Sequence, residues 1–110
     1  MNDTPVYLLA QLDVKDHEEY MRRYGMPAIA VLQKYGAEVL VASATPTVLE
    51  GAWAGNWTVV LRFPSRASAE AFYRAPEYGP LKALRADVLT RGGPVLLLDG
   101  FDAAALSRPA

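Results

Sequence analysis

Glu50 is the side chain best suited to general-base chemistry. It precedes Gly51, which lets the backbone turn sharply, and Trp53 and Trp57 follow it closely. An apolar tryptophan wall beside a carboxylate raises its pKa, which equips the group to accept a proton from a substrate. The alternative is an acid that only accepts hydrogen bonds from the amides of its own loop.

Two arginines are candidate anion anchors. Arg62 has the same strand parity as Gln11 and Asp99, so the three are expected on one sheet face if their strands flank the first strand. Two strand spacings are about 10 Å, which is close enough for Arg62 to bridge to Asp99 through Gln11 or to bind a ligand carboxylate. A polar patch or an ion pair across a dimer is the alternative. Arg85 is the second anchor, and its structural alternatives are an ion pair with Glu77 or a contact to a partner chain.

Tyrosine and phenylalanine residues recur on both predicted helices and predict an aromatic cavity between helices and sheet. Their hydroxyl groups would orient a small ligand. The alternative is a plain core with hydroxyls that reach the surface. The candidate catalytic residue is therefore Glu50, and the candidate ligand-binding residues are Tyr20, Tyr24, Trp53, Arg62, Tyr78 and Arg85.

No motif indicates an organic or metal cofactor. The chain has no cysteine, and His17 is its only histidine, so one chain cannot form a thiolate or multi-histidine metal site. Phosphate-binding glycine loops, serine elbows and calcium loops are missing, and Arg91-Gly92-Gly93 is a turn. His17 follows a helix cap and is expected to face solvent.

Composition narrows the class of protein. Of 110 residues, 52% are hydrophobic and 21% charged, which predicts a folded domain. The 11 basic and 12 acidic residues nearly cancel and are interspersed, which argues against a nucleic-acid partner. No stretch has the roughly 20 apolar residues of a membrane helix, and the N-terminus lacks a basic leader. We expect a cytoplasmic protein without a membrane partner.

The pattern of elements predicts one ferredoxin-like α+β domain over residues 1–110, with a core of about 5–100. Asp16 and Ser65 are predicted helix caps, and Gly25 with Pro27 should kink or split the first helix near its middle. The expected order is βαββαβ, a four-stranded antiparallel sheet with two helices on one face. The predicted strands are 6–14, 39–44, 57–63 and 95–99, with a short extended piece at 48–51 and a loose tail at 101–110.

Both faces of the predicted sheet are apolar, which is unusual for a sheet with one wet face. Leu8, Leu12, Val59, Leu61, Phe63, Leu96 and Leu98 are assigned to one face, and Tyr7, Leu9, Val60, Val95 and Leu97 to the other. Exposing five such side chains would forfeit on the order of 10 kcal/mol. We therefore expect a homodimer formed through the uncovered face.

The sequence resembles the bacterial domain-of-unknown-function 1330 family from Tyr7 to Gly100. The resemblance is carried by Glu50-Gly51, Phe63-Pro64-Ser65, Ala69, Tyr73, Pro76-Glu77-Tyr78, Leu81 and Arg85. It implies the dimeric α+β barrel superfamily, in which two sheets pack face to face. That superfamily includes cofactor-free oxygenases, haem-degrading enzymes, isomerases, dismutase-like proteins and ligand-binding regulators, so the fold does not choose a reaction.

Three functional hypotheses follow, and the residues leave the choice among them open. The first is a cofactor-independent small-molecule enzyme of oxygenase, isomerase or lyase type, with Glu50 as base and Arg62 or Arg85 as anion anchor. The second is a non-catalytic dimer that binds or senses a small ligand in the same cavity. The third is a purely structural dimer.

Overall fold

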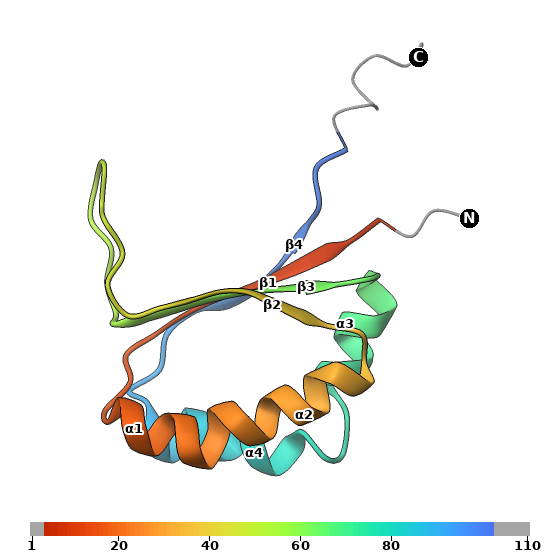
Figure 1. Ribbon diagram of the computed structural model, residues 1–110, viewed down its shortest axis with the longest axis horizontal. Coiled ribbons are helices and arrows are strands. Elements are labelled where there is room, and N and C mark those ends of the chain that lie inside the picture. The colour runs from red at the N-terminus through yellow and green to blue at the C-terminus, as the bar shows by residue number, and fades with distance from the viewer. Residues whose placement is uncertain (1–3, 103–110) are drawn as a thin grey trace.

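A four-stranded antiparallel sheet with helices on one of its faces forms the structure. The computed structural model describes residues 4–102. The strands β1 (Val6–Leu12), β2 (Glu38–Ser43), β3 (Trp57–Phe63) and β4 (Val95–Asp99) lie in the order β2-β3-β1-β4. Figure 1 shows the helices on one side of this sheet. The predicted α+β class and βαββαβ order are confirmed.

The first helical layer runs without interruption from His17 to Lys34. It comprises α1 (His17–Tyr20), η1 (Met21–Gly25) and α2 (Met26–Lys34), and the junction residues Tyr20 and Met26 keep helical backbone angles. The side chain of Asp16 caps it by accepting the amide of Glu19 at 3.0 Å, as predicted. At the expected kink or split, the helix continues through a π-helical turn, because Pro27 has no N–H to continue the α-helical hydrogen bonds.

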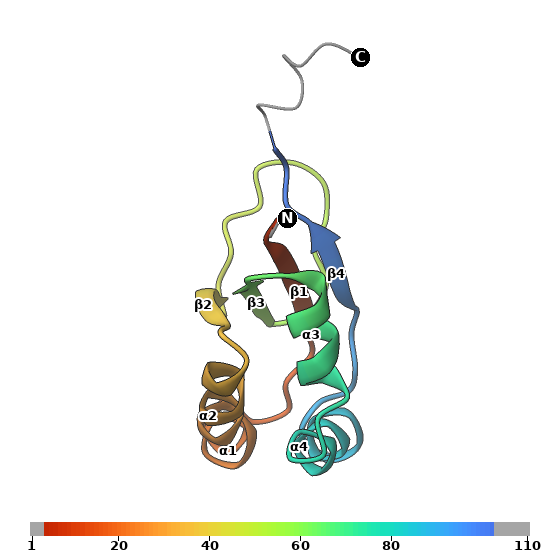
Figure 2. The same ribbon diagram turned by 90° about the vertical axis from the view of Figure 1, so that its right-hand side faces the viewer.

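The second helical layer follows β3. Ser65 accepts the amide of Ser68 at 3.1 Å and so caps α3 (Arg66–Tyr73), as its sequence predicts. Next come α4 (Gly79–Leu84) and a second π-helical turn, η2 (Arg85–Leu89). In Figure 2 the two helical layers stand side by side below the sheet.

The strand register shows which side chains face the helices. Along β1, Leu8, Ala10 and Leu12 are buried against the helices, while Tyr7 and Leu9 are partly buried on the opposite, outer face. Because Leu96 pairs with Leu9 and Leu98 with Tyr7, both leucines of β4 belong to the outer face. The assignment of Leu96 and Leu98 from parity was therefore wrong, and so was that of Val95 and Leu97, which pair with Ala10 and Leu8 and face the helices. It failed because the alternation of faces along one strand cannot be carried by residue number through a long loop into another strand.

The outer face remains apolar after this correction. Val41, Leu96 and Leu98 are each more than 40% exposed, and Leu9 and Val60 lie between them on the central strands. The segment 44–56 between β2 and β3, here called the arm, extends from the sheet to the side opposite the helices (Figure 1). The arm has no strand at 48–51, where a short extended piece was expected.

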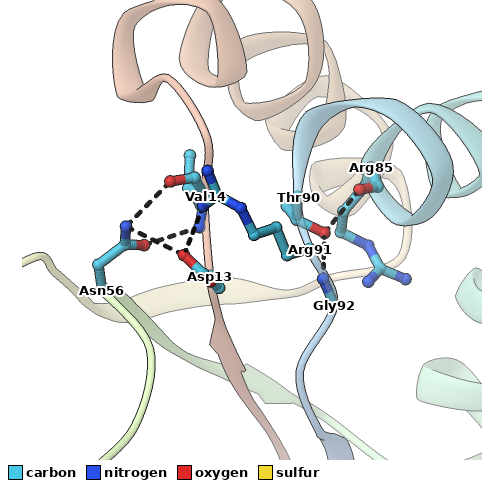
Figure 3. Close-up of polar contacts among 7 residues, drawn as sticks. All are labelled: Asp13, Val14, Asn56, Arg85, Thr90, Arg91 and Gly92. Atoms are coloured by element: carbon cyan, nitrogen blue, oxygen red, sulfur yellow. Dashed lines mark hydrogen bonds and ion pairs between the residues drawn. The ribbon is translucent and has the colours of Figure 1, made fainter.

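Hydrogen bonds at one end of the sheet connect β1 and the residues just after it to the arm and to the segment 90–94 before β4, here called the β4 entry. The amide group of Asn56 both accepts the N–H of Val14 at 2.7 Å and donates to its carbonyl at 2.9 Å (Figure 3). Arg91 donates to Asp13 at 3.1 Å, and Val14 forms a bridge with Thr90. Asn56 thus takes the place of a strand partner, a role that its position in the sequence did not reveal. Of the tail predicted at 101–110, residues 101 and 102 belong to no helix or strand, and residues 103–110 lie outside the described residues.

Candidate functional site

A cavity of about 100 Å³ lies between the sheet and both helical layers. Its walls are almost entirely apolar and include Leu8 and Ala10 of β1, Trp57 and Leu61 of β3, and Phe72 of α3. Val39 and Ala42 of the edge strand β2 also line it and are solvent-exposed, so the cavity opens between β2 and α2. An engineered apolar cavity of about 150 Å³ accepts benzene, so this one suits a ligand of a few carbon atoms.

Few polar side chains line the cavity, and they come from both helical layers. Tyr20 and Tyr24 belong to the first layer, Tyr73, Tyr78 and Arg85 to the second. The hydroxyl oxygens of Tyr24 and Tyr78 lie 2.6 Å apart. The structure thus brings together four of the predicted ligand-binding residues, namely Tyr20, Tyr24, Tyr78 and Arg85.

Aromatic packing fixes the orientation of these side chains. The Tyr20 and Tyr24 rings are 5.2 Å apart, and the Tyr78 ring lies 4.3 Å from that of Phe72. Trp57 contacts Tyr20 on its other side, with ring centroids 6.2 Å apart. Such contacts fix the directions in which the hydroxyl groups point.

Both π-helical turns contribute polar cavity residues. Tyr24 lies in η1 and Arg85 in η2. A π-helical turn shifts the following side chains around the helix, and such turns are frequent at functional sites. The pair Gly25 and Pro27 is a signal for the first turn in the sequence, whereas we recognise no signal for the second.

Burial keeps the cavity tyrosines in their neutral form. Desolvation raises the pKa of Tyr20 to about 12, despite the opposing effect of Arg85. Desolvation, with an added contribution from Tyr78, also raises the pKa of Tyr24 well above its ordinary value. These groups therefore donate hydrogen bonds at neutral pH and do not act as bases.

Arg85 is the buried cation of the cavity, only 7% exposed. Desolvation works to lower its pKa. The negative charges of Tyr78 and Tyr24, which exist only when these phenols are ionised, and a hydrogen bond with Tyr78 outweigh that effect and raise the pKa above its ordinary value. Its guanidinium points away from Asp13 and Thr90 (Figure 3). No carboxylate among residues 4–102 forms an ion pair with it. The expected pair with Glu77 does not form, because Glu77 lies 3.4 Å from Lys34 instead.

The structure does not bring Glu50 and Trp53 to this cavity. Both lie on the exposed arm, and the carboxylate of Glu50 makes no hydrogen bond or ion pair with any described residue. The indole of Trp53 donates to Thr58 at 3.1 Å. It is Trp57, not Trp53, that lines the cavity. A catalytic role of Glu50 stays a prediction, without support from the geometry of a single chain.

Arg62, Gln11 and Asp99 do not form the predicted polar patch. Arg62 pairs across the sheet with Tyr7 and binds Glu38 at 3.2 Å, whereas Gln11 lies opposite Thr58 at the other end of β1. Asp99 instead accepts a hydrogen bond from Arg66 at 2.6 Å. Parity placed Arg62 and Gln11 on the same face correctly, although the register separates them along the sheet. Its assignment of Asp99 to that face was wrong, because Asp99 pairs with Val6, whose side chain faces the helices.

His17 does not simply face solvent as expected. It is partly buried, and its ring lies 5.5 Å from that of Trp57 in an edge-on arrangement. No group of three or more histidine, aspartate or glutamate side chains that could hold a metal ion occurs within residues 4–102.

A second hollow of about 250 Å³ lies between α3 and β4. Although it is larger than the cavity, its charged residues Glu70 and Arg74 approach each other to 3.8 Å at the surface. No unpaired group converges there, so the smaller cavity is the better candidate site.

The fold and the cavity define a small α+β protein with an apolar candidate site between its sheet and its helices. The chain belongs to the family described as Domain of unknown function (DUF1330), which it matches over residues 5–101. This confirms the resemblance seen in the sequence. No curated protein matches the chain.

Two solved structures share the fold. The crystal structure of the RPA0582 protein of unknown function from Rhodopseudomonas palustris is 15% identical with a TM-score of 0.73, covering 92% of this chain and 85% of that one. The methylated RPA0582 protein is 15% identical with a TM-score of 0.74, covering 93% and 84%. At this identity the similarity establishes the fold alone. Within residues 4–102, no helix has the length and apolarity to cross a membrane.

Proposed function

We propose that this protein binds a small organic ligand in the cavity between its sheet and its helices. The supporting observation is that Tyr20, Tyr24, Tyr78 and Arg85, from two separate helical layers, converge on one apolar space. A purely structural protein gains stability by filling such a space and by keeping charge out of it. A few polar groups in an apolar pocket are instead typical of ligand sites.

A bulky side chain at the cavity opening tests this proposal. Ala42 lines the cavity yet is exposed, so Ala42→Trp should obstruct the opening without overpacking the core. Ala44→Trp is the matched control, because Ala44 is equally an exposed alanine just beyond β2 and does not line the cavity. Small aliphatic and aromatic compounds are titrated while Trp57 is followed by NMR. Binding that survives in the Ala42 variant as well as in the control would refute a site in this cavity.

The assembly that we propose is a homodimer formed through the outer face of the sheet. Its centre carries Leu9, Val60 and Leu96 and no charged side chain, because Arg62 lies near one end and is paired with Glu38. The arm, which extends to the same side of the sheet (Figure 1), carries the exposed Val48 and Leu49. A second copy is the simplest cover for this apolar area. As the sequence indicates, we expect this dimer to act in the cytoplasm.

A cofactor-independent oxygenase, isomerase or lyase is the second candidate function. It is favoured by the paired hydroxyls of Tyr24 and Tyr78 beside the Arg85 cation, since neutral hydroxyls and a cation stabilise a developing oxyanion. Such an enzyme also needs a base, and the described residues that line the cavity include no carboxylate or histidine. If Glu50 is that base, Glu50→Gln should abolish turnover of a bound compound while leaving its affinity unchanged.

A further inference from the structure

Arg85 is buried and has no acidic partner among the described residues, whereas the cations that form ion pairs are exposed. Among residues 4–102, ion pairs are made by Arg23, Lys34, Arg62, Arg66, Arg74 and Arg91, each with 38% or more of its side chain exposed. Arg85 is only 7% exposed and has no acidic partner there. Exposed pairs contribute little, whereas a buried charge without a counter-ion is strongly unfavourable. The ion pairs are therefore made by exposed cations, to which they add little stability, and the buried cation Arg85 has none.

The groups around Arg85 do not neutralise its charge. Its polar neighbours in the cavity are the phenol groups of Tyr78, Tyr24, Tyr73 and Tyr20, a class of side chain that carries no charge at neutral pH. They can solvate the guanidinium but cannot balance it. The cavity thus holds a net positive charge within apolar walls, and an anion that enters would find little competition from water.

The tyrosine pair provides a second point of contact for an anion. Each hydroxyl has one proton, and the bond between Tyr24 and Tyr78 uses one of the two. The other O–H is left to donate to a ligand. A guanidinium and a neutral O–H together match the two oxygens of a carboxylate.

Resting on the proposed function, we infer that the ligand is a small apolar monocarboxylate, with its carboxylate bound by Arg85 and the tyrosine pair and its carbon chain against Trp57 and Phe72. Arg85 is the only cationic residue that lines the cavity among the described residues, so a doubly charged phosphate ester would remain half-neutralised. The volume of about 100 Å³ limits the ligand to a few carbon atoms.

The test compares butyrate with butyramide, a neutral compound of the same shape. The full-length protein, labelled with ¹⁵N, is titrated with each, and the indole N–H signals of Trp57 and Trp53 are followed. Trp57 lines the cavity and Trp53 does not, so the second signal is an internal control. We expect butyrate to shift the Trp57 signal with saturation, and butyramide to bind at least about thirtyfold more weakly, as loss of a buried charge pair implies.

Variants at Arg85 complete the test. Arg85→Met, similar in length and without charge, should lose the preference for butyrate over butyramide, and Arg85→Lys should retain part of it. Equal binding of both compounds to the wild type overturns the monocarboxylate inference and leaves the proposed ligand cavity standing. No binding of either compound, or of any neutral apolar probe, overturns both. The wild-type comparison decides the matter even if a variant fails to fold.

Discussion

The hydroxyl oxygens of Tyr24 and Tyr78 lie 2.6 Å apart, joining the two helical layers inside the cavity. Tyr78 is buried, whereas Tyr24 is partly buried. Each of Tyr78→Phe and Tyr24→Phe should lower the free energy of unfolding by about 1–3 kcal/mol. The loss should be larger for Tyr78→Phe, because only the Tyr78 hydroxyl also hydrogen-bonds with Arg85. Chemical denaturation of both variants measures this difference.

A double-mutant cycle then isolates the Tyr24–Tyr78 interaction. Because each single change already breaks the shared bond, the double variant should lose less stability than the sum of the two. Tyr35→Phe is the control, since the Tyr35 hydroxyl makes no hydrogen bond with a described residue and its ring packs on Phe72. Strict additivity would show that the two hydroxyls contribute independently.

Arg85 should lower the stability of the unliganded protein. Replacing it with Met keeps most of its volume and removes an unpaired buried charge, so Arg85→Met should raise the free energy of unfolding by about 1 kcal/mol or more. Arg85→Ala, which also removes the packing of the side chain, should not. Thermal and urea denaturation of the three proteins measure the order. A less stable Met variant would mean that the surrounding hydroxyls already compensate the charge.

Glycine is required at position 93, where the β4 entry passes close to the backbone of β1. Its φ is +140°, and a Cβ there would overlap the carbonyl oxygen of Gln11. Gly92 also has positive φ, +100°, but open space around it. Gly92→Ala should cost about 1–2 kcal/mol from backbone strain alone. Gly93→Ala should cost clearly more, because the hydrogen bond from the Gln11 amide to Pro94 must also be disturbed. Equal losses, measured by urea denaturation, would contradict the close approach.

Local patterns in the sequence were sufficient for the elements of this fold. The strands 57–63 and 95–99 and the caps Asp16 and Ser65 were predicted because each depends on neighbouring residues only. The aromatic cavity was also within reach, since helical spacing places Tyr20 and Tyr24 on one face.

The strand register and the contacts between distant segments could not be predicted from local sequence patterns. The register of β1 against β3 separates Arg62 from Gln11, and the length of the chain between these two strands does not determine that register. The isolation of Arg85 and the strand-like bonding of Asn56 with Val14 depend on segments distant in the sequence. The separation of Glu50 from the cavity likewise depends on the direction of the arm, which no local pattern in the arm indicates.

Stability should fall steeply at high pH because of Tyr20. Its pKa is about 12 in the folded protein and 10.0 as a free group, so the unfolded chain ionises first. The contribution of Tyr20 is fully present below pH 10 and is lost as pH rises toward 12, at ~1 kcal/mol per pH unit. Urea denaturation at several pH values in this window should show a weaker pH dependence for Tyr20→Phe than for the wild type. Identical slopes would mean that Tyr20 ionises as readily in the folded protein.

The outer face of the sheet should determine the oligomeric state. Leu96 is 46% exposed and pairs across the sheet with Leu9, so Leu96→Asp would place a charge in the middle of the proposed interface. Val88 of η2 is 47% exposed in the helical layer and provides a matched control, Val88→Asp. In sedimentation experiments at micromolar concentration, the wild type and the Val88 variant should be dimers and the Leu96 variant a monomer, because an unpaired charge buried at an interface costs several kcal/mol.

Each outcome of that experiment separates one form of assembly from another. A wild-type monomer would contradict the homodimer and leave the apolar outer face to a different partner. A dimer that both aspartate variants disrupt would place the interface over the helices as well. A dimer that only the Val88 variant disrupts would move it there entirely, because the two substitutions add the same charge at nearly the same exposure and differ only in the face that carries it.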